Sequence, residues 1–311
     1  MSNNSFNEPL VSILIPTYNR PDYFELALQS ALKQTYQNIE IIIADGSTDM
    51  KTEEGIKAYL ADKRIRYFHK ADKNYEERIR MLMEMAKGDF VNYLLDDDIF
   101  HCEKIERMAG LMQLYPEVNL ITSYRKVIDK NGDIMEDTFA TQPISQQDLL
   151  FEGRNLGRHI LLRQLNFLGE LTTVLIRKSC VVLENIFRFF GQRICLDDVV
   201  WWLSLLIEGK VIYLAEAMSY FRVHRKQSSA NLLLQVYGLE AWFQLIQGFY
   251  KRKIFLENEA DYKKAYMIWR ERVLHYKNHG IVSNEQSEED RQQITTVMKQ
   301  LEKYMVDGDK K

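Results

Sequence analysis

The first part of the chain alternates short apolar runs with segments whose apolar residues recur at helical spacing. The runs, each about as long as one strand, are Val11–Ile15, Ile39–Ala44, Ile65–His69 and Phe90–Leu95. Such runs are typical of strands buried on both faces, and their alternation with helices implies a mostly parallel sheet with right-handed crossovers. The sequence therefore predicts an α/β fold, in which Pro16 ends the first strand and Pro21 lies in the first turn of the next helix.

The pattern changes in the middle of the chain. The pair Asn131-Gly132 lies between Leu120–Ile128 and Ile134–Thr138, which predicts a hairpin. Three later strands and one apolar helix are expected, the strands at Thr172–Ile176, Val211–Leu214 and Met218–Val223 and the helix at Val199–Ile207.

Strand signals stop beyond about Ser228. Apolar and aromatic residues then recur on helical faces, as in Leu239, Trp242 and Ile246. We therefore expect an α/β domain over residues 1–229 and a helical region over residues 230–311. Aromatic residues interleave with Lys and Arg in this tail, which indicates core packing or a homodimer interface; a face that contacts a membrane surface is the alternative.

Composition narrows the class of protein. Of 311 residues, 46% are apolar and 27% are charged, which allows a sizeable core, and a net charge of −3 gives no general attraction for nucleic acid. The three cysteines are far apart, so neither a disulfide framework nor a cysteine zinc site is expected. Because the first residues are polar and no apolar run is long enough to span a bilayer, the sequence favours a cytoplasmic protein.

Two strings follow the first two predicted strands, where ligands lie in open α/β sheets. Ile15-Pro16-Thr17-Tyr18-Asn19-Arg20 offers hydroxyl, ring and backbone groups, although it also suits a plain strand-to-helix turn. Ala44-Asp45-Gly46-Ser47-Thr48-Asp49 offers a carboxylate that can accept from a pyrimidine N–H, although Asp and Ser are also common helix caps.

Three consecutive carboxylates, Asp96, Asp97 and Asp98, follow the fourth predicted strand with no Lys or Arg adjacent in sequence. Such carboxylates repel one another unless a cation neutralises them. Oxygen ligands suit Mg²⁺ or Mn²⁺, and these ions retain sites for diphosphate oxygens. The alternative is an exposed acidic turn, but the position at a strand end favours a metal site.

Two later strings add candidates. Asp197 and Asp198 precede the apolar helix and could be caps, or one of them could be a base with a raised pKa. The string Tyr220–Ser229 contains His224, which could bind a metal or be an ordinary surface histidine. The signatures G-x-G-x-x-G, G-x-x-x-x-G-K-[ST] and G-x-S-x-G are absent, which disfavours dehydrogenases, P-loop enzymes and α/β-hydrolases.

Taken together and in this order, the five strings resemble the family 2 glycosyltransferases with the GT-A fold, a Rossmann-like mixed sheet. The resemblance covers about Pro9 to Ser229 and is closest to the bacterial spore-coat and surface-polysaccharide branch. It implies a set of nucleotide-binding residues: Pro16, Thr17, Tyr18, Asn19, Asp45, Arg78 and Asp96. Thr17, Tyr18 and Asp45 would hold uracil, Arg78 would lie over or beside the base, and Asp96 would contact the ribose.

The resemblance also implies the residues of the reaction. Asp97 would ligate Mn²⁺ or Mg²⁺, with Asp98 and His224 as further metal candidates, and Asp198 would be the catalytic base. Asp197, Gly169 and Glu170 are candidates for contacts with the acceptor or the donor sugar. Many members have an acid where this chain has Leu95, which leaves Asp96 with Asp98 as a competing metal pair.

The implied activity is inverting transfer of a hexosyl or N-acetylhexosaminyl group from a nucleotide sugar, a UDP-sugar being favoured. The acceptor would be a glycan, a lipid-linked sugar or a protein, which places the enzyme in the cytoplasm or at the inner face of the membrane. Two alternatives remain: a nucleotidyltransferase, which would release pyrophosphate, and a non-catalytic protein that binds nucleotide sugars.

Overall fold

The computed structural model describes residues 8–224, 232–278 and 287–308. The chain forms two compact units that interleave in sequence. The first unit comprises Met1–Glu152, Phe167–Ile186 and Glu208–Val223, and the second comprises Gly153–Asn166, Phe187–Ile207 and His224–Lys311. The sequence suggested a single boundary after residue 229 instead.

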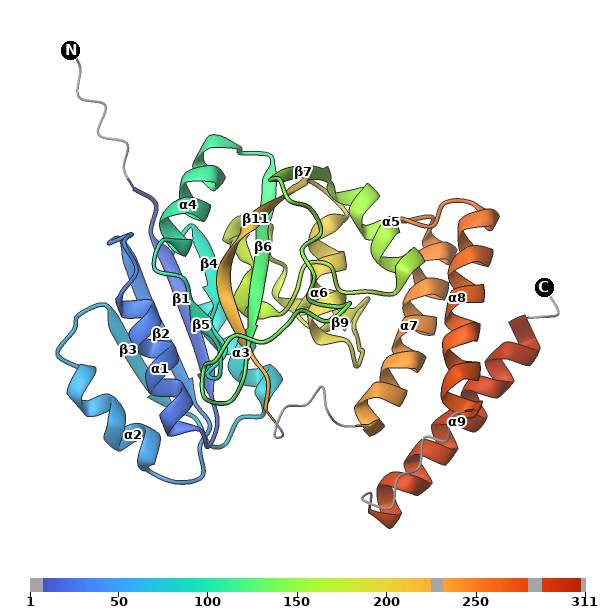
Figure 1. Ribbon diagram of the computed structural model, residues 1–311, viewed down its shortest axis with the longest axis horizontal. Coiled ribbons are helices and arrows are strands. Elements are labelled where there is room, and N and C mark those ends of the chain that lie inside the picture. The colour runs from blue at the N-terminus through green and yellow to red at the C-terminus, as the bar shows by residue number, and fades with distance from the viewer. Residues whose placement is uncertain (1–7, 225–231, 279–286, 309–311) are drawn as a thin grey trace. The chain divides into compact units, whose positions relative to one another are not determined.

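In the first unit, nine strands form one mixed sheet within the described residues. These strands are β1 (Val11–Thr17), β2 (Ile39–Asp45), β3 (Ile65–His69), β4 (Phe90–Tyr93), β5 (Ile99–Phe100), β6 (Val118–Ile128), β7 (Leu149–Glu152), β8 (Leu175–Arg177) and β11 (Lys210–Arg222). Their order is β3-β2-β1-β4-β8-β6-β11-β5, with β7 also on β11 (Figure 1). Strands β3, β2, β1 and β4 pair in parallel, whereas β8 is antiparallel to both β4 and β6. Strand β11 also pairs in parallel with β6, so the expected α/β sheet is confirmed as mixed but mostly parallel.

Helices cover both faces of the parallel part of the sheet. They are α1 (Pro21–Leu32), α2 (Lys51–Ile56), α3 (Tyr75–Met85) and α4 (Lys104–Leu114), together with short 3₁₀ helices at Lys57–Tyr59, Leu171–Thr173, Lys178–Cys180 and Leu183–Asn185. Every residue of β1 and β2 is buried, which explains their continuous apolar sequence. Alternate β1 residues Val11, Ile13 and Ile15 share one core with α1 and α4, while α3 packs against β1 and β2.

The proline predictions had different outcomes. Pro21 opens α1 as expected. Pro16 does not end β1, which continues to Thr17. Strand β4 pairs with β1 only as far as Leu14, so beyond that residue one edge of β1 is no longer paired with β4. A residue without an N–H is tolerated at such an edge.

Two other expectations about strands were wrong. After β6 the chain makes a turn, held by Asp129 Oδ1 accepting from the amides of Asn131 and Asp133, but no second hairpin strand forms. Instead of the predicted hairpin, the structure has one isolated antiparallel β-bridge between Ile128 and Ile134. The two late strands are one long strand, β11, whose pairing with β6 shifts register around Ala217.

The second unit is mainly helical. Its elements are α5 (Gly153–Arg163), the short antiparallel pair β9 (Arg188–Phe189) and β10 (Gln192–Arg193), α6 (Asp197–Leu206), α7 (Leu232–Arg252), α8 (Glu259–Asn278) and α9 (Glu288–Gly308). The predicted helical tail is confirmed by α7 to α9, and α7 and α8 pack side by side (Figure 1).

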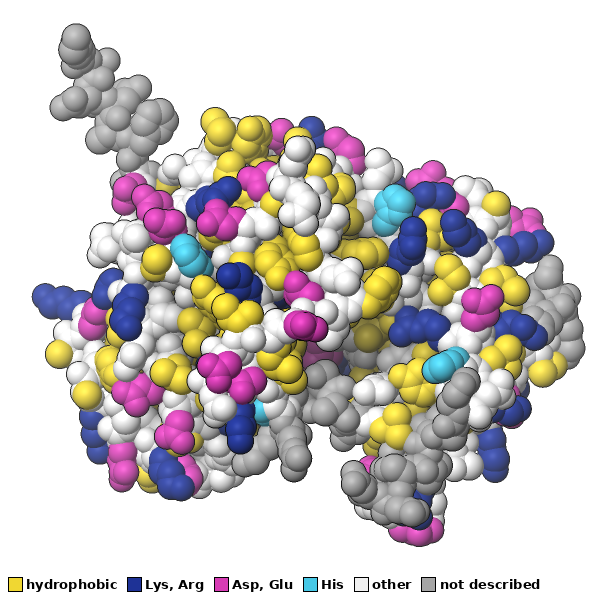
Figure 2. Space-filling view, viewed as in Figure 1, with side chains coloured by type: hydrophobic (Ala, Val, Ile, Leu, Met, Phe, Trp, Pro, Cys, Tyr) yellow, Lys and Arg dark blue, Asp and Glu magenta, His cyan; other side chains and the backbone are white. Residues whose placement is uncertain are grey.

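The aromatic residues of the tail mostly form the interior of this unit. Trp269 is fully buried, donates from Nε1 to the Leu239 carbonyl at 2.8 Å, and lies with its ring 4.6 Å from that of Phe243. On the face shown in Figure 2, side chains of both charges are spread among apolar ones over α7 and α8. The core-packing interpretation therefore accounts for these rings. None of the described helices is long and apolar enough to cross a membrane.

Candidate active site

The acidic turn after β4 is held by groups from the loop after β1. Asp96 Oδ2 accepts from Thr17 Oγ1 at 3.0 Å and from the Tyr18 amide at 3.1 Å. One guanidinium nitrogen, Arg20 Nη1, donates to Asp96 Oδ1 at 3.0 Å and to Asp97 Oδ2 at 2.7 Å. The two candidate strings separated by about eighty residues of sequence are thus in direct contact.

The third carboxylate of the turn points elsewhere. Asp98 is buried, and its two oxygens accept from Thr172 Oγ1 at 2.6 Å and from the Arg222 amide at 3.0 Å. Arg222 is also buried and donates from Nε to the Asp97 carbonyl at 2.8 Å. These contacts give Asp98 a structural role and leave Asp96 and Asp97 as the pair whose oxygens meet a cation.

Burial governs the electrostatics of the turn. It raises the pKa of Asp96 to about 6, and the negative charge of Asp97 adds to this effect, while Arg20 and the Tyr18 amide oppose it. Burial raises the pKa of Asp98 well above its usual range, with smaller contributions from the charges of Asp97 and Glu170. A cation beside the turn would stabilise the ionised forms.

Asp45 and Arg78 lie close to Tyr18 at the end of the parallel strands. Asp45 is fully buried and accepts from Tyr67 Oη and from the Ser47 amide, both at 2.7 Å. The Arg78 guanidinium carbon lies 5.6 Å from the centre of the Tyr18 ring, and Tyr18 is 49% exposed. Arg78 Nε is buried and has no hydrogen-bond partner among the described residues. A carboxylate, an exposed ring and an unsatisfied donor suit a flat, polar ligand.

Neither Asp45 nor Ser47 caps a helix, since α2 begins only at Lys51 with Met50 at its N-cap. Asn19 joins the two loops instead. Its amide donates to Ser47 Oγ at 2.9 Å, and its Oδ1 accepts from the Thr48 amide at 2.9 Å. Its φ of 53° lies in the left-handed region, which asparagine tolerates better than most residues.

Gly169 and Glu170 precede the 3₁₀ helix that supplies Thr172. Gly169 has a φ of 84°, which favours glycine. Glu170 Oε2 pairs with Arg125 Nε at 2.9 Å, while Glu170 Oε1 is buried without a hydrogen-bond partner among the described residues. Contacts of these residues with a sugar remain predictions.

In the second unit, Asp197 and Asp198 are the first two residues of α6, and the N-cap is Leu196. Neither aspartate therefore occupies the N-cap position that the capping alternative assigns to it. Asp197 forms an ion pair with Arg193, one turn earlier in the chain. Asp198 is half-buried at the start of a helix whose next five residues are buried.

His224 follows β11, is half-buried and belongs to the second unit, while residues 225–229 of its string lie outside the described residues. Within residues 8–224, 232–278 and 287–308, no three or more His, Cys, Asp and Glu side chains group as a metal site. Asp96 and Asp97 nevertheless fit Mg²⁺ or Mn²⁺, because these ions need only one or two carboxylates when substrate phosphates supply further oxygens.

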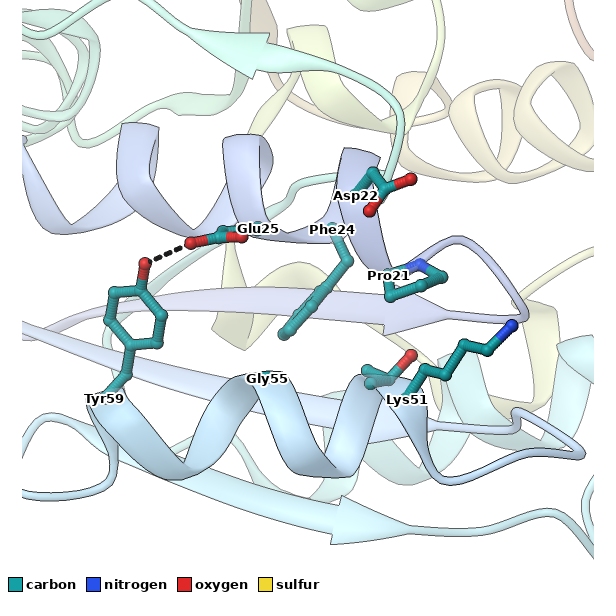
Figure 3. Close-up of a pocket in the computed structure, with 8 residues that line it drawn as sticks. Pro21, Asp22, Phe24, Glu25, Lys51, Gly55 and Tyr59 are labelled. Carbon is teal, nitrogen blue, oxygen red and sulfur yellow. Dashed lines mark hydrogen bonds between the residues drawn. The ribbon is translucent and has the colours of Figure 1, made fainter.

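A separate depression of about 250 Å³ lies between α1 and α2. Figure 3 shows Phe24, Gly55 and Lys51 around it, with Tyr59 Oη donating to Glu25 Oε1 at 2.7 Å. It includes no residue of the acidic turn, and its volume is below the range of about 300–1,000 Å³ usual for ligand pockets. We therefore do not assign the nucleotide to it.

Comparison with known proteins identifies the family. A family model described as "Glycosyl transferase family 2" matches residues 12–176. The chain belongs to this family. The matched segment contains the loop after β1, the acidic turn and Thr172, so the hydrogen bonds between them lie inside the part of the glycosyltransferase that is shared with the family.

Several relatives of this chain are bacterial proteins. Protein CgeD of Bacillus subtilis is 35% identical over 129 residues, which are 39% of this chain and 30% of that protein. An uncharacterized glycosyltransferase of Rickettsia typhi is 31% identical over 81% of this chain and 74% of its own. A Campylobacter jejuni protein is named GalNAc(5)-diNAcBac-PP-undecaprenol beta-1,3-glucosyltransferase. It is 24% identical over 86% of this chain and 82% of its own length. This chain spans only 30% of the length of CgeD. It spans 19% and 21% of the length of uncharacterized glycosyltransferases from Rickettsia bellii and Rickettsia felis.

Solved structures confirm the GT-A fold of the glycosyltransferase. S. aureus TarS 1–349 in complex with UDP-GlcNAc has a TM-score of 0.63 at 15% identity, covering 92% of this chain and 79% of that one. The mannosyltransferase PcManGT from Pyrobaculum calidifontis, in complex with GDP-Man and Mn²⁺, has a TM-score of 0.56 at 13% identity, covering 94% and 80%.

Two residues that contact the acidic turn were not among the predicted site residues. Arg20 follows the nucleotide-binding residues predicted in the first string, and its guanidinium donates to both Asp96 and Asp97. Arg222 joins β11 to the acidic turn. A basic residue next to a ligand-binding loop was the available signal for Arg20, whereas the position of Arg222 depends on a contact between residues more than 120 apart.

Replacing Gly46 by alanine should weaken nucleotide binding by displacing Arg78. A Cβ at Gly46 would overlap the Arg78 guanidinium, which must then leave its position beside Tyr18. We expect UDP affinity, measured by calorimetry, to fall about 10-fold, as for losing a contact worth about 1–2 kcal/mol. Gly110→Ala in α4 is the control, because nothing lies within 4 Å of its added Cβ. Equal UDP affinities for both variants would contradict the placement of Arg78 in the site.

Proposed function

We propose that this protein is an inverting glycosyltransferase that moves a hexosyl or N-acetylhexosaminyl group from a UDP-sugar to an acceptor hydroxyl. The observation that carries the proposal is the acidic turn. Its Asp96 is bonded to the loop after β1, beside the group formed by Tyr18, Arg78 and Asp45. The proposal places nucleotide recognition and diphosphate binding at one end of the parallel strands.

Uracil is the base that this group suits best. Asp45 accepts two hydrogen bonds from protein groups, and a carboxylate with about four lone-pair sites can accept a third from a pyrimidine N–H. Tyr18 offers an exposed ring, and Arg78 offers a planar guanidinium with an unsatisfied Nε. The UDP-GlcNAc bound to TarS supports a UDP-sugar, whereas the GDP-Man bound to PcManGT supports the alternative base.

In the proposed reaction, Asp96 contacts the ribose and Asp97 holds Mn²⁺ or Mg²⁺. When bound, this cation supplies positive charge to the departing diphosphate. Asp198 accepts the proton of the attacking hydroxyl, and a single base opposite the leaving group gives inversion without a covalent intermediate. The chain's own residues chiefly position the donor and the acceptor.

The acceptor is proposed to be a glycan or a lipid-linked sugar in the synthesis of a bacterial polysaccharide or glycoconjugate. The support is the Campylobacter jejuni relative, whose name describes a sugar chain on undecaprenol diphosphate. A protein acceptor, contact with a membrane surface and a homodimer formed through the helical unit are further proposals.

A panel of nucleotide sugars tests this function. We expect a UDP-sugar to raise the melting temperature more than a GDP-sugar does, and Mn²⁺ to accelerate release of UDP from that donor. Stronger stabilisation by GDP-mannose would contradict the choice of base. Release of pyrophosphate would indicate a nucleotidyltransferase, and UDP binding without turnover on any acceptor would indicate a non-catalytic binding protein.

A further inference from the structure

The acidic turn already has a cation on it, and this cation comes from the chain itself. Arg20 Nη1 lies 3.0 Å from Asp96 Oδ1 and 2.7 Å from Asp97 Oδ2. A single nitrogen is therefore shared by two carboxylates, unlike the fork arrangement in which two guanidinium nitrogens bind the two oxygens of one carboxylate. Arg20 therefore places its positive charge at Asp97, the residue that would hold a divalent cation, and at the adjacent Asp96.

The Asp96 carboxylate and the backbone of Asp97 have contacts that do not involve Arg20. The second oxygen of Asp96 is held by Thr17 Oγ1 and the Tyr18 amide. The backbone of Asp97 is held by Arg222 Nε, and the next residue, Asp98, is bonded to Thr172 and Arg222. Loss of the Arg20 contact would therefore leave the Asp96 carboxylate and the backbone of Asp97 in place.

Exposure also differs between the partners. The side chains of Asp96 and Asp97 are each 8% exposed, whereas that of Arg20 is 27% exposed. Two adjacent carboxylates with so little contact with water need a neutralising charge. Arg20 provides one positive charge from the solvent side, and its long side chain stems from the residue just before α1, so it can leave without disturbing a helix.

We propose that Arg20 is a displaceable counter-cation, which neutralises Asp96 and Asp97 in the empty enzyme and leaves them when a divalent cation binds. This inference rests on the proposed metal site at Asp97. Arg20 then competes with the metal, so the empty enzyme binds metal more weakly than the two carboxylates alone would. The enzyme gains metal readily only when the donor diphosphate adds its own oxygens.

The test measures Mn²⁺ affinity in the absence of nucleotide, from the free Mn²⁺ signal in electron paramagnetic resonance. Arg20→Gln removes the charge but keeps a side chain of similar shape, and we expect it to bind Mn²⁺ about 10-fold more tightly than wild type. Arg64→Gln is the matched control, because Arg64 is 29% exposed and pairs with Asp62 away from the turn. Its Mn²⁺ affinity should equal that of wild type. Unchanged or weaker binding by Arg20→Gln would overturn the proposal.

Thermal unfolding gives a second readout. In EDTA, Arg20→Gln should melt below wild type and below Arg64→Gln, and Mn²⁺ should raise its melting temperature more than it raises theirs. If Arg20→Gln does not fold, Arg20→Lys replaces it: its ammonium keeps one charge but holds two carboxylates less well, so tighter Mn²⁺ binding than wild type is again expected. An unchanged affinity there would also overturn the proposal.

The nucleotide site is tested separately by titrating UDP in EDTA. If UDP binds but Arg20→Gln gains no Mn²⁺ affinity, the proposed function stands and the role of Arg20 is wrong. If no variant binds Mn²⁺ even with UDP present, the counter-cation role and the metal site both fail, while UDP binding in EDTA still decides the nucleotide site.

Discussion

Replacing Asp198 by asparagine is expected to lower turnover about 100-fold or more, with folding and UDP affinity close to those of wild type. Asparagine has the same shape but cannot accept the proton of the attacking hydroxyl. Asp198 lies in the first turn of α6, where the helix dipole favours a negative charge by only about 0.3–1 kcal/mol. Asp198 is not the N-cap residue, which is Leu196, and asparagine suits the first turn of a helix about as well as aspartate does. Single-turnover transfer rates and UDP calorimetry separate the two effects.

Asp197→Asn provides the control in the same helical turn. It weakens the ion pair with Arg193, which is partly exposed, and a partly exposed pair contributes little to stability. We expect its transfer rate to stay near that of wild type. If Asp197→Asn loses activity and Asp198→Asn keeps it, the base is the other aspartate. If both keep activity, this string does not carry the proton transfer.

Replacing Asp97 by alanine is expected to abolish the gain in UDP affinity that Mn²⁺ gives and to slow Mn²⁺-dependent transfer about 100-fold or more, because charge on the departing diphosphate is no longer stabilised. UDP affinity in EDTA should change little, since Asp96 keeps its bonds to Thr17 and Tyr18. Calorimetric titrations of UDP with and without Mn²⁺ measure both quantities.

Two comparisons make the Asp97 experiment decisive. Asp62→Ala removes a carboxylate that pairs with Arg64 instead of facing the turn, and it should respond to Mn²⁺ like wild type. Asp98→Ala addresses the competing metal pair and should destabilise the fold, because Asp98 is buried and bonded to Thr172 and Arg222. Equal UDP affinities with and without Mn²⁺ in wild type would refute the metal role of Asp97.

The strands and helices of the parallel part of the sheet could be predicted from patterns in the local sequence. The continuous apolar runs at β1 and β2 arise because both faces of these strands are covered, so their periodicity could be interpreted correctly. Pro21 at the start of α1 and the apolar faces of α7 and α8 follow from equally local rules.

The errors occur where contacts between distant residues decide the outcome. Asn131-Gly132 does form a turn, but Arg222 Nη1 donates to the carbonyls of Asp129 and Lys130, so this turn is joined to the end of β11. Nor did β11 appear as one strand in the sequence, since Ala215 and Glu216 interrupt its apolar pattern where its pairing with β6 shifts register. Neither the contact of Arg222 with this turn nor the pairing of β11 with β6 could be predicted from residues that are neighbours in sequence.

In the candidate site, too, local sequence signals were sufficient for some residues, whereas contacts between distant residues decided the roles of others. Asp45, Asp96 and Asp97 could be identified because carboxylates at strand ends are a local signal. The different roles of Asp97 and Asp98 could not, because they depend on which way each side chain points. The Asp97 side chain faces Arg20, whereas that of Asp98 is held by Thr172 and Arg222.

The interleaving of the two units limits how this protein can be cut or recombined. The helical unit takes α5 and α6 from the middle of the chain and packs α5 against α7 and α8, with Arg158 on α5 paired to Asp261 on α8. A fragment that stops after residue 229 would keep α5 but lose the helices that cover it. A tail grafted from a relative would have to match both α5 and its ion pair. If the helical unit determines which acceptor is used, a swap of the C-terminal helices alone is not expected to transfer that preference. The middle segments that belong to the same unit would have to be exchanged with them.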